Sequence, residues 1–185
     1  MKEYTLSGRQ VNLYGLLFVI PAILIACIPY ILIWCDFGLV MERNRTAIQY
    51  IMESPLWLIL VPMVILVGVV LHELIHGIVM AAFAKNGWKS VSFGFNIRAF
   101  APYAHCKEPL SPNAYRLTCV MPCFLLGDIP VLIGWITGDI LFLFFGIMFW
   151  CAAVGDIMIF WMSRNITGGM LQDHPDKIGF LHVEE

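Results

Sequence analysis

Long apolar runs alternate with short polar stretches along the chain, and four of the runs are long enough to cross a membrane. They cover about residues 11–35, 56–84, 113–136 and 139–163. A helix needs about 20 mostly apolar residues to cross the hydrocarbon core of a bilayer, so each run predicts one spanning helix. The pattern therefore predicts a mainly α-helical, polytopic membrane bundle of about four spans. We expect the first span to remain as an anchor, because its apolar run exceeds that of a signal peptide.

The segment between the second and third runs has a different period. Its apolar and polar residues alternate, as in a β-strand. The apolar positions of this alternation are Val91, Phe93, Phe95 and Ile97. A second short strand over about residues 101–107 can pair back on the first, so we expect a short β-hairpin over about residues 89–108. After the fourth run, residues 164–185 form a polar tail in which "KIGFLHV" has the composition of a strand.

Composition agrees with a membrane protein. Of the 185 residues, 60% are hydrophobic and 13% are charged, whereas soluble domains have about 45–50% apolar and about 25% charged residues. The formal net charge of -2 provides no basic surface, so nucleic acid is not an expected partner. The length suits one membrane-embedded domain over residues 1–185, with the lipid bilayer as its surroundings.

Lysine and arginine residues are distributed unevenly between the ends of the predicted spans. If the N-terminus is cytoplasmic, only Arg43 and Arg45 lie outside. The other nine of the 11 basic residues then lie inside; they are Lys2, Arg9, Lys85, Lys89, Arg98, Lys107, Arg116, Arg164 and Lys177. Because basic residues gather on the cytoplasmic side of membrane proteins, we expect both termini in the cytoplasm. We expect an integral protein of a prokaryotic cell membrane.

The second run contains three ionisable residues, His72, Glu73 and His76, in the stretch "VLHELIHGIV". Residues four apart lie on one face of a helix, so both imidazoles can bind one metal ion. Glu73 can instead reach a water molecule beside the ion, as the general base of an H-E-x-x-H zinc site. Two structural core histidines are the alternative interpretation. It is disfavoured because ionisable side chains inside a span are rare and usually functional.

A catalytic zinc site needs a third protein ligand, and depth in the membrane separates the candidates. At 1.5 Å per residue, His72 and His76 lie roughly 14–20 Å from the cytoplasmic end of their span. Asp156 lies roughly 12 Å from the same face in the fourth span, so it matches best. Asp128 lies deeper in the third span. His105, where the hairpin leads back towards the site, could be an extra ligand, a hydrogen-bond donor to the transition state or a surface residue.

Cys119 and Cys123 form a second pair of residues on one helical face that could hold a metal. The preferred interpretation is that these thiols are buried and act as small apolar side chains. The six cysteines of the chain include no C-x-x-C pair, so we expect no disulfide framework.

The "HELIHG" helix, followed by an aspartate in a later span, resembles the membrane-embedded metalloproteases of the site-2 protease type. More closely, the chain resembles a family of zincin peptidases long catalogued only as a domain of unknown function. The matching stretches are "HELIHG", "HCKEPL", the "GD" at residues 155–156 and the tail "DHPDKIGF". The resemblance covers most of the chain from about residue 56. One departure is that site-2 proteases usually carry their late aspartate in an Asp-Gly pair, whereas Asp156 precedes Ile157.

The resemblance implies a zinc ion on His72, His76 and Asp156, with Glu73 as the catalytic base. It implies hydrolysis of peptide bonds in a membrane protein or membrane-proximal peptide, near the cytoplasmic side. In site-2 proteases the segment after the metal helix can pair with an extended substrate. The hairpin is therefore expected either to receive a substrate strand at the edge of "SVSFGFNIRAF" or to cover the site against lipid.

Two other functions compete with a membrane zinc endopeptidase. One is a catalytically inactive scaffold that binds metal, but such a protein has no need of Glu73. The other is a small metal transporter. A transport path needs polar groups through the full depth of the membrane, whereas here they gather near one face, with Asp128 as the exception.

Overall fold

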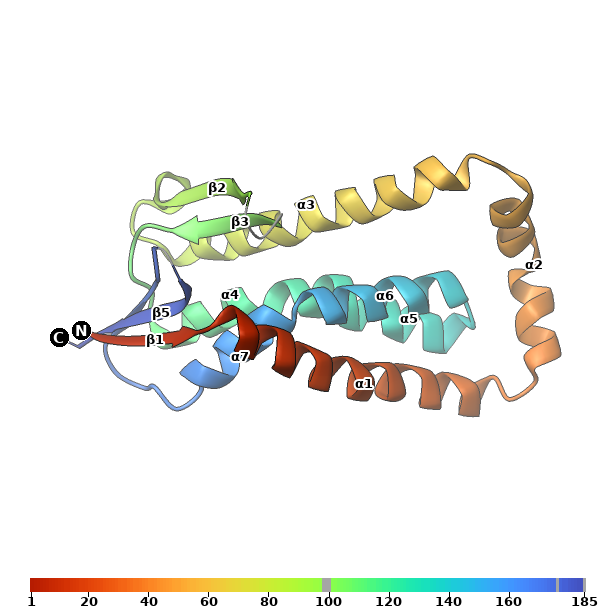
Figure 1. Ribbon diagram of the computed structural model, residues 1–185, viewed down its shortest axis with the longest axis horizontal. Coiled ribbons are helices and arrows are strands. Elements are labelled where there is room, and N and C mark those ends of the chain that lie inside the picture. The colour runs from red at the N-terminus through yellow and green to blue at the C-terminus, as the bar shows by residue number, and fades with distance from the viewer. Residues whose placement is uncertain (98–100, 176, 185) are drawn as a thin grey trace.

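A computed structural model of the protein describes residues 1–97, 101–175 and 177–184. The described chain is mainly helical, with two small antiparallel sheets. The helices are α1 (Gly8–Ile33), α2 (Phe37–Glu53), α3 (Trp57–Phe83), the 3-10 turn η1 (Gly87–Ser90), α4 (Pro112–Cys123), the π-helical turn η2 (Phe124–Asp128), α5 (Ile129–Thr137), α6 (Ile140–Ala152) and α7 (Val154–Ser163). Both sheets lie at one end of the molecule with both termini, and α2 lies at the other end (Figure 1).

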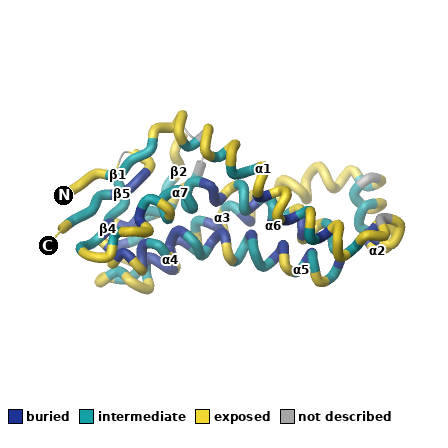
Figure 2. Tube along the Cα trace, turned by 90° about the horizontal axis from the view of Figure 1, so that it is seen from below, coloured by how far each residue is buried: buried dark blue, intermediate teal, exposed yellow. Residues whose placement is uncertain are grey.

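Three helical stretches of the described chain are long and apolar enough to cross a membrane. They are α1, α3 and the continuous stretch Pro112–Thr137, which contains α4, η2 and α5. Their ends agree with three of the predicted runs to within about three residues. Most side chains of α1 are exposed (Figure 2) although the helix is apolar, as expected of a helix whose surroundings are lipid.

The fourth predicted run is not one helix. Helices α6 and α7 meet at an angle of 51°, so the prediction of a single span over residues 139–163 is corrected to a bent pair. Ala153, at φ -79° and ψ 6°, ends α6 and precedes α7. The two helices have different neighbours, because α6 packs mainly against α5 and η2 whereas α7 packs mainly against α4. As a result, Asp156 lies in the first turn of a new helix.

A wide helical turn interrupts the third stretch at η2. Pro130 follows this turn, and a proline has no N–H to donate and crowds the preceding turn with its ring. The turn therefore widens to a π-helix, as it often does where regular helical hydrogen bonding is blocked. The Trp150 indole Nε1–H of α6 donates a 2.6 Å hydrogen bond to Asp128 at the end of this turn.

The predicted hairpin is confirmed. Strand β2 (Val91–Asn96) pairs antiparallel with β3 (Ala101–Cys106), with Val91 opposite Cys106. Positions 98–100 lie outside the described residues, and with them Arg98 of the charge count. Positions 176 and 185 of the tail lie outside them too.

The tail is more ordered than the predicted polar segment with one strand. Strand β4 (Met170–Asp173) pairs with β5 (Ile178–Val183), which contains the predicted strand. Strand β5 also pairs with β1 (Lys2–Leu6) at the N-terminus, giving the sheet order β1-β5-β4. Neither β1 nor α2 was predicted from the sequence; the first turn of α2 is capped by the Asp36 carboxylate. Strand β4 brings the carboxylate of Asp173 to the site described below.

One hydrophobic core joins this sheet to the helices that carry the site. Its buried members are Met80, Cys106, Leu110, Ala114, Tyr115, Cys119, Leu171 and Phe180. They come from α3, the hairpin region, α4 and the C-terminal sheet. The C-terminal sheet is therefore packed directly against α3 and α4.

Candidate metal centre

Two helices bring three potential metal ligands together. His72 and His76 lie one turn apart on α3, and Asp156 faces them from the start of α7. The two Nε2 atoms are 3.3 Å apart. The Nε2 atom of His72 lies 3.0 Å from Oδ2 of Asp156, and the Nε2 atom of His76 lies 3.4 Å from Oδ1 of the same carboxylate. Both imidazoles are buried, so the donor atoms converge in the interior.

These separations fit a zinc ion. Ligand atoms held about 2.0–2.1 Å from a tetrahedral zinc lie about 3.3 Å from one another. The two Nε2 atoms, 3.3 Å apart, and the His72 Nε2 and Asp156 Oδ2 atoms, 3.0 Å apart, are close to this value. The 3.4 Å separation from His76 Nε2 is to the other oxygen of Asp156, Oδ1. Two imidazole nitrogens and a carboxylate oxygen also form a ligand set that zinc commonly accepts. The described side chains thus leave one tetrahedral position for a water molecule or substrate.

The orientation of His76 is fixed by a backbone group. Its Nδ1 lies 3.0 Å from the carbonyl oxygen of Thr118 on α4. A carbonyl can only accept, so Nδ1 carries the proton and donates, and Nε2 presents its lone pair to the site. The Nδ1 atom of His72 is buried without a hydrogen-bond partner among the described residues. The Phe149 ring lies against this imidazole, with a distance of 6.4 Å between ring centroids.

Two glycines of α3 allow other elements to approach the metal ligands. A Cβ atom added at Gly68 would lie 2.3 Å from the buried Phe149 ring of α6. A Cβ atom added at Gly77 would lie 2.4 Å from the Phe93 ring of β2. The glycine that ends "HELIHG" therefore lets the hairpin pack against the metal helix.

A pocket of about 230 Å³ opens beside the three ligands. Glu73, His76 and Asp156 line it from the helices, and Ala104 of β3 and Asp173 of β4 line it from the sheets. Glu73 is partly buried, and the backbone N–H of Ala104 interacts with its carboxylate. Glu73 is thus next to the convergent ligands, facing space that a substrate can fill.

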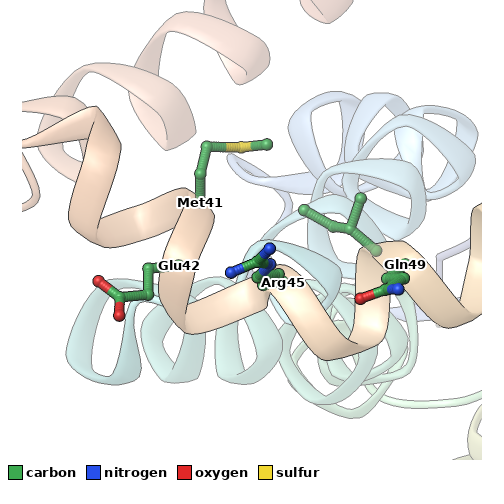
Figure 3. A pocket seen from close by; sticks show the side chains of 5 residues that line it. Met41, Glu42, Arg45 and Gln49 are labelled. Atoms are coloured by element: carbon green, nitrogen blue, oxygen red, sulfur yellow. The ribbon is translucent and has the colours of Figure 1, made fainter.

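A larger hollow of about 590 Å³ lies along α2, at the opposite end of the molecule. It is lined by Met41, Glu42, Arg45, Ile48 and Gln49 of this one helix, four of which are labelled in Figure 3. These side chains include only one carboxylate and no histidine or cysteine, so they do not form a metal site. We therefore place the candidate site at the smaller pocket.

The other predicted candidates lie apart from the convergent group. Asp128 is engaged by Trp150, as described above. The His105 Nδ1 atom lies 3.7 Å from a carboxylate oxygen of Asp173. Cys119 lines the pocket and both it and Cys123 are buried, but the described residues offer one metal-compatible group of three, which contains neither cysteine.

Sequence reasoning missed Asp173. Its carboxylate accepts hydrogen bonds from the Cys106 N–H at 2.9 Å and the Tyr115 hydroxyl at 2.8 Å. Burial raises the pKa of the Asp173 carboxyl, while these two hydrogen bonds act in the opposite direction. The "DHPDKIGF" stretch was the one signal in the sequence that involved this residue.

Comparison with known families gives one match. A family described as "Putative zincin peptidase" matches residues 65–167, which is more than half of the chain. The matched region runs from α3 to the residues just after α7, so it contains both histidines, Glu73 and Asp156. Comparisons with curated proteins and with solved structures give no match.

Proposed function

Because the chain belongs to this zincin peptidase family, we propose that it is a membrane-embedded zinc metallopeptidase of the H-E-x-x-H type. Its substrates would be membrane proteins or membrane-proximal peptides. One observation carries the proposal: the donor atoms of His72, His76 and Asp156 converge at zinc-ligand separations, and Glu73 faces the adjoining pocket. The likeness to site-2 proteases, inferred from the motifs, belongs to the same proposal.

In the proposed reaction, a zinc ion held by His72, His76 and Asp156 would polarise the scissile carbonyl and acidify the attacking water. The Glu73 carboxylate accepts a hydrogen bond from that water and takes its proton as the oxygen attacks the carbonyl carbon. Glu73 then passes the proton to the nitrogen of the breaking peptide bond, which leaves as an amine. His76 keeps its orientation throughout, since its Nδ1–H donates to the carbonyl of Thr118.

The arrangement of the termini supports four membrane crossings. Strand β1 at the N-terminus pairs with β5 at the C-terminus, so both ends of the chain lie on the same side. A chain whose ends lie on one side of a membrane crosses it an even number of times. Three long apolar helices and the bent pair α6–α7 together provide four crossings. The distribution of basic residues makes the end with the sheets cytoplasmic.

We further propose that an extended substrate segment pairs with β3. Within the hairpin, the Lys107 N–H donates to the Ser90 carbonyl. Because backbone groups alternate in direction along a strand, Cys106 and Ala104 then point away from β2. Ala104 lines the pocket beside Glu73, as do Pro102 and Tyr103 before it in β3. The proposed substrate edge is thus β3, rather than the β2 segment considered from the sequence, and pairing there would hold a peptide bond open to attack.

The test compares zinc content and cleavage in purified wild-type protein, His72→Ala and Glu73→Gln. The substrates are single-span membrane segments reconstituted with the enzyme in lipid vesicles. We expect zinc in the wild type and in Glu73→Gln and its loss from His72→Ala. Glu73→Gln should lose cleavage by about 10²–10⁴-fold, the usual contribution of a general base.

Glu53→Gln is the matched control, because Glu53 is an exposed carboxylate at the far end of the molecule. It should keep both zinc and cleavage. A wild-type protein without zinc contradicts the proposal, as does normal cleavage by Glu73→Gln. Zinc binding without cleavage of any segment by the wild type would instead support an inactive scaffold.

A further inference from the structure

The C-terminal sheet reaches the pocket through Asp173, the last residue of β4. This side chain lines the same pocket as Glu73 and Asp156, although it comes from a different layer of the molecule. Strand β4 is held beside the hairpin region by paired backbone hydrogen bonds between Leu110 and Leu171. Asp173 is therefore fixed in place at one end of the β3 edge.

The N–H groups of β3 that point away from β2 are hydrogen-bonded to two carboxylates, those of Glu73 and Asp173. Along this edge the outward positions are Pro102, Ala104 and Cys106, and proline has no N–H to offer. Ala104 faces Glu73 of the metal helix. Cys106, two residues further, donates its N–H to Asp173 at 2.9 Å.

The contact with Cys106 is supported on the other side of the carboxylate. The second oxygen of Asp173 accepts from the Tyr115 hydroxyl at 2.8 Å, and Tyr115 is buried on α4. His105 approaches the first oxygen at 3.7 Å. Both oxygens are therefore engaged by the protein, which suits a positioning role better than direct binding of a substrate cation.

We propose that Asp173 is a positioning residue that ends substrate pairing on β3 at Ala104 and so selects which peptide bond reaches Glu73. The inference rests on the proposed peptidase function and on pairing of substrate with β3. In the proposed reaction Glu73 turns from the Ala104 N–H to the attacking water, which frees that N–H for the substrate strand. Asp173, held by Tyr115, keeps the Cys106 N–H, so the substrate strand has only the part of the edge beside the metal ligands. A strand that slips along its partner keeps the same side chains facing the pocket only if it moves by two residues. Without Asp173, the neighbouring register two residues away becomes available.

The test maps the cleavage products of wild type, Asp173→Ala and Asp173→Asn by mass spectrometry, on one cleaved membrane segment. We expect one cleavage position for the wild type and for Asp173→Asn, whose amide oxygen still accepts from Cys106. Asp173→Ala should add a product displaced by two residues. Glu184→Gln is the control, because Glu184 is an exposed carboxylate just beyond β5, and it should give the wild-type product.

A zinc-loaded Asp173→Ala protein that yields the wild-type product alone, or no product, overturns the inference while the peptidase function stands. Failure of the wild type to cleave overturns the proposed function instead. If Asp173→Ala does not fold, the inference is tested by hydrogen exchange of the Cys106 amide in the Glu73→Gln protein. The Cys106 amide should be protected equally with and without the bound segment. Protection that appears at Cys106 only when the segment binds would show that the substrate pairs there, against the inference.

Discussion

The close contact between α3 and α6 at Gly68 gives a sharp prediction about the metal centre. Gly68 lies one helical turn before His72, and its missing side chain makes room for Phe149. We predict that Gly68→Ala weakens zinc binding and activity although it touches no ligand. The added methyl carbon would lie 2.3 Å from the ring, whereas contacting carbons lie about 3.5–4.0 Å apart.

The overlap of at least about 1.2 Å has few ways to relax. Phe149 is only 1% exposed, so its ring has no space to turn into and the two helices must separate instead. Overpacking of this kind costs about 1–3 kcal/mol of folding free energy. It also moves His72 on α3 away from Asp156, which follows α6. We expect kcat/KM to fall about 100-fold, because a displacement of about 1 Å has effects of that size.

The assay combines a zinc affinity, from competition with a chelator, with the cleavage rate in vesicles. Zinc affinity should fall about 10–100-fold, as it does when groups behind metal ligands are disturbed. Gly155→Ala is the matched control, since a Cβ atom there meets no described atom within 4 Å although Asp156 is adjacent. It should differ from wild type by less than about twofold, because the added methyl group enters open space. Wild-type zinc affinity and activity in Gly68→Ala would show that the close contact between α3 and α6 at Gly68 does not position His72.

Two further predictions concern the third ligand and the orientation in the membrane. Asp156→Ala should abolish stoichiometric zinc binding while Asp128→Ala retains it, measured by metal analysis of the purified proteins; the reverse would move the ligand to the third span. A membrane-impermeant maleimide should label Cys35 on intact cells, because this thiol is exposed between α1 and α2, and Cys35→Ser should remove the signal. Cys106 should stay unlabelled even after lysis, because its thiol is buried and burial raises the pKa of that thiol. Labelling of Cys35 only after lysis would invert the proposed orientation.

The three long apolar helical stretches and the hairpin could be predicted because local patterns encode them. A run of apolar residues identifies α3, and alternation identifies β2, without reference to the rest of the chain. The rise per residue of a helix was enough to select Asp156 as the third candidate ligand, and the structure does bring Asp156 to His72 and His76. That the two histidines lie on one face of α3 could be predicted from their spacing of one helical turn alone.

Features that depend on contacts distant in sequence were missed. Strand β1 is a strand because β5 pairs with it, and these partners lie at opposite ends of the chain. The break at Ala153 carries no proline or glycine of its own and follows from the different packing partners of α6 and α7. Asp173 looked like part of a polar tail because its hydrogen-bond partner in β3 is 67 residues away.

The most direct measurement is the zinc K-edge X-ray absorption spectrum of the purified, zinc-loaded protein. We expect nitrogen and oxygen atoms at about 2.0–2.1 Å from the zinc, with scattering from two imidazole rings. The spectrum should lose one imidazole contribution in His76→Ala. A sulfur shell at about 2.3 Å would place the ion on Cys119 and Cys123 and contradict the account.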